Sequence, residues 1–495
     1  MRRHESDENS NHFIKPNIET WGFTMLENNQ LQQATSRSNF KTAGLSVLAS
    51  AIMAAMAPSL VVAQELSETK PMYVPPSEPN EFLDGRVQVN FLAMQNYQAI
   101  QAKDGAFRPE DETQSDGFGR LRVNLMFKFK ITDNITADID IAEEPNDFGN
   151  NGDRDFSFHQ DFAGIEFDMF GLTGYEKENS SLILRVGNIG ASPFQFKGFQ
   201  DGADNQGNAL IGNGINDYAT AENGIQLSYT ETFDSGILRS YNVAGHMTTS
   251  SFGEAFQEDR GYNYRLQGTL EFKGGFKAGL NVFQANQGDQ LVFADGVASL
   301  DGVTTTNYRF GDGENYNFSA SASSERDTHV GALPGLNQSI MQLNLAYQPS
   351  DQTSVIVMLG KASDDYTFAD SDGNAVAGIT YFGTDGVLDP TGTTFDSNQV
   401  IEGDSSVQYW ALEAQQYILP EKLYVAARYA ESENTSDLIE QTDNDVTRLQ
   451  VSAGYWINDR TLWKVEYVNQ DEGVNSGGQI GTGFDGITSE ISVKF

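Results

Sequence analysis

The sequence has no cysteine, little positive charge and few residues of the catalytic types. Without cysteine, the 495 residues can form no disulfide, no Cys-ligated zinc or iron–sulfur site and no thiol nucleophile. Only 31 Lys and Arg stand against 69 Asp and Glu, which gives a formal net charge of −38. Because so acidic a surface repels a phosphate backbone, we expect no nucleic-acid partner. Disorder is not expected either, since 39% hydrophobic residues can bury a large surface.

Histidines are also scarce, and none stands in a catalytic motif. Downstream of residue 63 the chain has His159, His246 and His329, whose spacing matches no metal site. The sequence contains no GxSxG elbow and no phosphate loop. His246 with Ser250 or Ser251 could mimic the Ser–His pair of barrel-type hydrolases, but those barrels have fewer strands than this chain predicts. We therefore expect no enzymatic activity, no catalytic residue, no metal and no cofactor.

An apolar segment in the first part of the sequence has the layout of a secretory signal. The Ala/Leu/Met-rich run 43–57 follows basic residues and precedes small residues that end at Ala63. This pattern predicts a signal peptide over about 41–63, cleaved after Ala63. A single membrane anchor is the alternative, although the run is shorter than the roughly 20 residues that span a bilayer. The polar residues 1–40 form an extension, within which Met25 is an alternative translation start.

Farther along the chain, apolar and polar residues alternate with a period of two. In residues 120–131, RLRVNLMFKFKI, every second side chain is apolar, and the others are Arg, Asn, Met or Lys. The turn Thr132-Asp133-Asn134 follows, and the alternation resumes through residue 141. These two segments predict a β-hairpin with one apolar face.

The connections between such strands alternate in length. Seven are short or fairly short, and they lie near residues 132–134, 171–180, 232–236, 274–275, 349–352, 419–422 and 457–460. Eight are long and rich in Gly, Asp, Asn and Ser, and they lie near residues 95–117, 143–160, 190–222, 248–260, 286–338, 364–405, 432–445 and 470–483. Together these connections join sixteen strands, with both ends of the strand series on the short-turn side.

We therefore predict an all-β fold, a transmembrane antiparallel β-barrel of about 16 strands with short periplasmic turns and long extracellular loops. A soluble β-sandwich has no reason to keep all its long connections at one end. In lipid, only a closed barrel pairs every backbone amide of a sheet. Half of each strand then faces water, which fits the mean hydropathy of −0.43. The predicted parts are the extension 1–40, the signal 41–63, a short periplasmic segment 64–84 and the barrel 85–495.

The final predicted strand, residues 484–495, supports this fold. Ile487, Ile491, Val493 and Phe495 lie on one face of it. An alternating strand that ends on an aromatic residue resembles the assembly signal that outer-membrane barrels present to their insertion machinery. That machinery is therefore an expected partner, through Phe495.

Residues 80–495 resemble the sixteen-stranded, usually trimeric porins of the Gram-negative outer membrane. The resemblance implies passive diffusion of small hydrophilic solutes and ions, a homotrimer, and contact with the outer membrane and its lipopolysaccharide. In that family the third long loop folds into the barrel and narrows it, and here the third long connection is residues 190–222. The segment LRVGNIGASPF, residues 184–194, loosely resembles the phosphate-selective porin superfamily, which makes a phosphate-type porin an alternative function.

The candidate functional site is a charged constriction of the pore. Barrel closure brings the first and last strands together, so their inward-facing basic residues form one arc: Arg120, Arg122, Lys128, Arg428, Arg448 and Lys464. The third long connection would face this arc with its acidic residues Asp201, Asp204, Asp217 and Glu222. Opposite charges across a narrow passage create a field that sets ion selectivity. The alternative is that the basic residues are ordinary lumen residues away from the narrowest point, paired with Asp138, Asp140 or Glu466.

Two other functions remain open, as does the net ion selectivity. Residues 364–404 contain nine acidic residues and no Lys or Arg, so this outer loop would attract cations, against the pull of the basic arc. Four aromatic residues of the third connection would suit a sugar-specific porin by stacking on sugar rings: Phe194, Phe196, Phe199 and Tyr218. A secreted all-β adhesin is a further alternative. Extraction separates it from a barrel, because a barrel requires detergent.

Overall fold

The computed structural model describes the residues that carry the predicted strands. These are residues 80–102, 114–118, 121–143, 159–175, 177–190, 206–212, 221–249, 262–286, 291–293, 336–370, 401–436, 445–472 and 483–495. The predicted extension and signal lie outside these ranges, as do most residues of the predicted long loops. Within the ranges, no helix is both long and apolar enough to cross a membrane.

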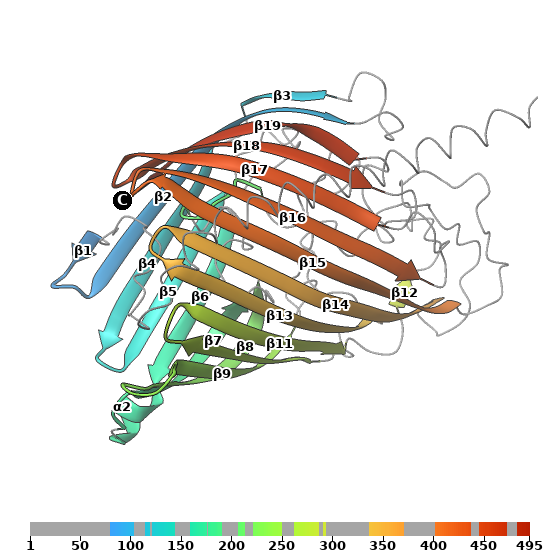
Figure 1. Cartoon of the computed structure of the whole chain (residues 1–495). Coiled ribbons are helices and arrows are strands. Elements are labelled where there is room, and N and C mark those ends of the chain that lie inside the picture. Colours follow the sequence, from blue (N-terminus) through green and yellow to red (C-terminus); the bar gives the residue numbers. More distant parts are fainter. Residues whose placement is uncertain are drawn as a thin grey trace, which may run out of the picture. The chain divides into compact units, whose positions relative to one another are not determined.

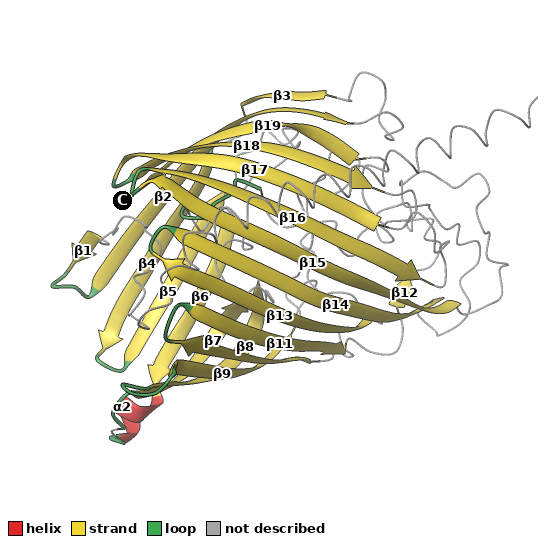
Figure 2. Ribbon diagram, in the orientation of Figure 1, coloured by secondary structure: helices red, strands yellow, loops and turns green. Residues whose placement is uncertain are grey.

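Sixteen long strands form one closed antiparallel sheet (Figure 1 and Figure 2). Each strand pairs with its neighbours in sequence and the last pairs with the first, so the wall has no open edge. The strands are β2 (Val87–Ala102), β4 (Arg122–Thr132), β5 (Ile135–Glu143), β6 (His159–Asp168), β7 (Ser180–Gly190), β8 (Ala221–Thr232), β9 (Leu238–Thr249), β10 (Asn263–Phe272), β11 (Phe276–Asn286), β13 (Leu336–Ser350), β14 (Thr353–Asp370), β15 (Ile401–Leu419), β16 (Leu423–Ser436), β17 (Asp445–Asn458), β18 (Thr461–Glu472) and β19 (Gly483–Lys494). The predicted barrel of about 16 strands is confirmed.

Three short strands and one helix complete the described fold. β1 (Asn80–Phe82) forms a hairpin with the start of β2. β3 (Gln114–Phe118) pairs with the second half of β2, beyond the part that pairs with β4. β12 (Leu291–Phe293) runs parallel to the end of β14. The helix α2 (Met169–Thr173) lies in the connection between β6 and β7, and its N-cap is Asp168.

The connections lie at alternate ends of the barrel as predicted, but some strands are longer than the sequence pattern indicated. The seven connections predicted to be short join strands at one end, and the eight predicted to be long join them at the other, although the β6–β7 connection (169–179) is longer than the β16–β17 connection (437–444). β14 and β15 have 18 and 19 residues, more than the roughly 10 that span lipid. The connection predicted at 364–405 is therefore shorter at both sides. At the ends of β14 and β15 next to this connection, residues on both faces are polar, so the sequence shows no alternation of apolar and polar residues. The strand pairing nevertheless continues there, for example between Asp364 and Ser405.

The seam between the first and last strands is closed at the short-turn end. The ladder of β19 and β2 ends with Lys494 opposite Leu92. Beyond it, the N–H of Phe91 donates to the carbonyl of Phe495 at 2.6 Å, and the N–H of Phe495 donates to the carbonyl of Phe91 at 2.9 Å. The two ring centroids are 4.8 Å apart. The seam therefore combines main-chain pairing with an aromatic contact.

The wall is apolar outside and polar inside. Ile139, Ile165 and Val186 lie on three adjacent strands and are 39–41% exposed. On the other face, polar side chains such as Gln450 and Glu466 are fully buried. A soluble β-sandwich has the reverse arrangement, with its apolar face inside. A barrel in lipid requires an apolar exterior.

Two inward-facing tyrosines each lie over a glycine of the neighbouring strand. Tyr424 of β16 is opposite Gly454 of β17, and Tyr409 of β15 is opposite Gly360 of β14. A Cβ atom built at either glycine would lie 2.1 Å from the Cζ atom of the facing tyrosine. Both tyrosine side chains are buried. The two glycines therefore leave the space that the rings fill.

We expect Gly454→Ala to destabilise the folded barrel by about 1–3 kcal/mol, because the added methyl group must displace the Tyr424 ring. Urea titration of the refolded protein, followed by tryptophan fluorescence, measures the change. Gly245→Ala is the matched control, since a Cβ atom built at that strand glycine meets no heavy atom within 4 Å. Equal losses of stability in the two variants would contradict this explanation.

Candidate pore constriction

A short segment of the third long connection lies inside the barrel, against its wall. Residues 206–212 belong to the connection between β7 and β8, and all of them except Gly207 are buried. They contact side chains of β16, β17, β18 and β19. β17 is eight places from β8 in the ring of sixteen strands. Residues 206–212 therefore lie against the wall opposite β8, one of the two strands that their connection joins.

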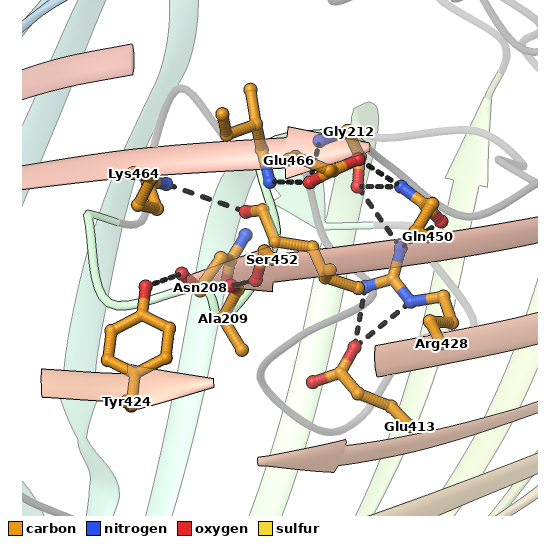
Figure 3. A network of polar contacts seen from close by, with 12 residues as sticks. Asn208, Ala209, Gly212, Glu413, Tyr424, Arg428, Gln450, Ser452, Lys464 and Glu466 are labelled. Atoms are coloured by element: carbon orange, nitrogen blue, oxygen red, sulfur yellow. Dashed lines mark hydrogen bonds and ion pairs between the residues drawn. The ribbon is translucent and has the colours of Figure 1, made fainter. Parts of the chain in front are cut away.

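The end of this segment is bound through its main chain (Figure 3). Oε2 of Glu466 accepts the N–H groups of Ile211 and Gly212 at 2.5 and 3.4 Å. The carbonyl of Gly212 accepts from Nη1 of Arg428 and from Nε2 of Gln450, both at 3.1 Å. Gln450 also donates to Oε1 of Glu466 at 2.9 Å. Buried peptide groups of the segment are thus hydrogen-bonded by three side chains of the wall.

The middle of the segment is bound in the same way. Three consecutive carbonyls accept hydrogen bonds from side chains of the wall: Asn208 from Tyr424 at 3.5 Å, Ala209 from Ser452 at 2.6 Å and Leu210 from Lys464 at 3.4 Å. Only main-chain atoms of these residues take part in the bonds, as Figure 3 shows. The wall therefore recognises the path of the chain more than the identity of its side chains.

The start of the segment combines a polar anchor with an apolar contact. Nε2 of Gln206 donates to the carbonyls of Ser492 and Arg460, both at 3.0 Å. The Ala209 side chain belongs to a buried apolar cluster whose other members are Tyr417, Tyr424, Ala426, Trp456 and Leu462. Within it, Nε1 of Trp456 donates to the hydroxyl of Tyr417 at 3.1 Å. Apolar burial thus adds to the hydrogen bonds that hold the segment.

The basic residues beneath the segment are paired with carboxylates of the wall. Nη2 and Nε of Arg428 lie 2.7 and 3.0 Å from Oε2 of Glu413. Nζ of Lys464 lies 2.7 Å from Oε1 of Glu490. These four side chains are only 1–4% exposed. The positive charges of Arg428 and Lys464 are therefore compensated on the wall and covered by the segment.

The structure brings part of the predicted site together. Arg428 and Lys464 contact the segment, whereas Arg448 is buried on β17 and donates from Nε to Gln470 at 2.8 Å. Arg122 is buried on β4, and Lys128 is exposed on the same strand. Glu222 lies in β8. The remaining predicted residues lie outside the described ranges: Arg120, Asp201, Asp204, Asp217 and the aromatic residues Phe194, Phe196, Phe199 and Tyr218. A transverse field between acidic loop residues and the basic arc stays a prediction.

Sequence reasoning missed most partners of the docked segment. Glu413 is opposite Arg428 in the ladder, and Glu490 is opposite Lys464. The period-two pattern places all four inward, so the register between neighbouring strands is the signal that could have paired them. No sequence pattern marks Gln206, because two of its three acceptors are main-chain carbonyls and the third is the Ser492 hydroxyl.

Strands β5, β6 and β7, elsewhere on the wall, carry a second charged cluster. Nη1 and Nη2 of Arg185 on β7 each lie 2.7 Å from an oxygen of Asp138 on β5. Nη1 also lies 3.2 Å from Oε1 of Glu166 on β6. Gly164 makes room for the guanidinium, since a Cβ atom there would lie 2.7 Å from Cζ of Arg185. This cluster is more exposed than the pairs beneath the segment, with 16%, 31% and 36% of the Arg185, Asp138 and Glu166 side chains exposed.

Comparisons with known proteins find similar folds but no close relative. No family model and no curated protein matches the sequence. Structural neighbours include OmpF of Salmonella typhi in complex with daunomycin (13% identity, TM-score 0.46, 84% of this chain and 100% of that one). They also include the anion-selective porin of Comamonas acidovorans (12% identity, TM-score 0.45, 83% of this chain and 99% of that one). A third is the outer-membrane channel DcaP of Acinetobacter baumannii (11% identity, TM-score 0.44, 86% of this chain and 100% of that one).

Proposed function

We propose that the chain is an outer-membrane porin, a passive diffusion channel for small hydrophilic solutes and ions. The observation that carries this proposal is the binding of residues 206–212 against the inner wall of a closed sixteen-stranded barrel. A barrel of this size encloses an aqueous channel. A segment fixed inside the barrel narrows this channel. Because a solute moves down its gradient unchanged, the proposed function requires no catalytic residue, metal or cofactor.

The proposed location follows from the outer surface of the wall. Exposed apolar side chains cover neighbouring strands, and water would make such a surface aggregate. Lipid accepts it, and the closed ladder leaves no unpaired backbone edge in the hydrocarbon region. Barrels with short turns at one end and long loops at the other are typical of the bacterial outer membrane.

Planar-bilayer recording of the detergent-extracted protein tests the function. We expect discrete conductance steps in KCl, because a water-filled lumen passes ions one channel at a time. The same preparation denatured by heat is the control and should give no steps. Absence of steps from folded protein that shows a heat-dependent position on gels would refute the proposed function.

We further propose that the protein assembles as a homotrimer in contact with lipopolysaccharide and that residues 41–63 direct its export. The support is the resemblance of residues 80–495 to trimeric porins and the composition of the signal segment. Conductance steps recurring in threes, and chemical cross-linking to a trimer, would support the oligomer; a solely monomeric species would refute it. N-terminal sequencing of the exported protein should begin at Gln64.

A further inference from the structure

The two charged walls of the lumen differ in how their charges meet the solvent. Beneath residues 206–212, the paired side chains of Arg428, Glu413, Lys464 and Glu490 are at most 4% exposed. On β5, β6 and β7 the cluster of Asp138, Glu166 and Arg185 is 16–36% exposed. An ion in the lumen therefore meets the charges of the second cluster, whereas the docked segment covers those of the first.

We propose that Asp138, Glu166 and Arg185 determine the ion selectivity of the channel and make its lumen favour cations. The inference rests on the proposed function and deepens it, since it names the residues that select the solute. It assigns this role to β5, β6 and β7, whereas the docked segment is bound by side chains of β16, β17, β18 and β19. The basic residues Arg428 and Lys464 have a different role, which is to hold the segment in place.

The first reason is that one guanidinium serves two carboxylates. Arg185 makes two bonds of 2.7 Å to Asp138, and its Nε donates to the carbonyl of Asn188 at 3.0 Å. Its contact with Glu166 is a single longer one, at 3.2 Å. The three side chains together carry one net negative charge. Glu166 is both the most exposed and the least tightly bound of them, so its charge is the most available to a passing cation.

The second reason is that neighbouring charged groups do not reverse the net negative charge of the cluster. Lys128 is opposite Asp138 in the ladder and Asp140 lies on the same face, so their two charges offset one another. Arg265 is a further cation of the wall, but it is buried, with 6% exposed. On the adjoining strand β4, Arg122 is buried and Lys130 is paired with Asp133. Strands β8 and β9 contribute the neutral side chains Ser228, Thr230 and Asn242, and farther along the wall Lys277 is paired with Glu271.

Reversal potentials under a KCl gradient test the inference, with two variants that should act in opposite directions. We expect Glu166→Gln to lower the ratio of potassium to chloride permeability about twofold, because it removes the exposed carboxylate and leaves the Arg185–Asp138 pair intact. Arg185→Gln should raise the ratio about twofold, because both carboxylates lose their counter-charge. Asp351→Asn is the control: it removes one charge at an exposed turn between β13 and β14 and should leave the ratio unchanged.

The outcomes separate this inference from the proposed function. Conductance steps with opposite shifts in the two variants support it. Steps with a ratio that neither variant changes refute the inference and leave the porin function standing. A folded unaltered protein that gives no steps refutes both. Heat-dependent mobility on gels shows whether each variant is folded. If Arg185→Gln does not fold, the permeability ratio of Glu166→Gln alone tests the inference.

Discussion

Deletion of residues 206–212 should about double the single-channel conductance and admit larger solutes, because it removes a segment that occupies the lumen beside the wall of β16–β19. The wall that it exposes carries hydroxyl, amide and paired charged groups that water can solvate, beside the apolar cluster that Ala209 joins. The barrel itself should remain closed, since none of its strand ladders includes these residues. Bilayer recording gives the conductance, and swelling of liposomes in oligosaccharides of increasing size gives the exclusion limit.

A deletion of the same length provides the control. Residues 378–384 also form a stretch of seven uncharged residues in a long connection, the one between β14 and β15. Their removal should leave the conductance near that of the unaltered protein. Equal conductance in both deletion variants and the unaltered protein would mean that residues 206–212 do not limit the current.

Arg428→Met should cost about 3–5 kcal/mol of unfolding free energy, because it leaves the buried carboxylate of Glu413 without its cation. It also removes one of the two donors to the carbonyl of Gly212. Urea titration of the refolded barrel gives the unfolding free energy. The current noise of single channels reports whether the segment has become mobile.

The double variant Arg428→Met with Glu413→Leu distinguishes a lost ion pair from lost packing. It removes both buried charges, so most of the lost stability should return. A double variant as unstable as Arg428→Met would show that the ion pair is not the cause. The current noise should stay high in the double variant, because Gly212 still lacks its donor from Arg428.

The fold could be predicted from the sequence because lipid imposes a simple pattern on it. Every strand that crosses the hydrocarbon has one apolar face, so Leu125, Phe127 and Phe129 mark β4 without knowledge of its partners. The pattern failed at the far ends of β14 and β15. There both faces of the ladder carry polar residues, and only hydrogen bonding defines the strand.

The candidate site was less accessible to sequence reasoning, for a physical reason. The same alternation placed Arg428 and Lys464 correctly on the inner face. Their partners on the segment, however, are the carbonyls of Gly212 and Leu210. Every residue has a main-chain carbonyl, so the residue type does not indicate which carbonyl accepts such a hydrogen bond. The ion pairs with Glu413 and Glu490 depend on strand register, which a single strand does not reveal.

The position of the segment also fixes an order of events during assembly. Ile211 and its acceptor Glu466 are separated by 255 residues, so the docking wall is synthesised long after the segment that it binds. The seam forms last, because β19 must pair with β2, as far as Lys494 opposite Leu92, before the barrel is closed. A sheet formed before the last strand is available would therefore keep two unpaired edges. The chain has to stay unfolded until that strand is available, and the channel acquires its constriction only after the wall of β16–β19 exists.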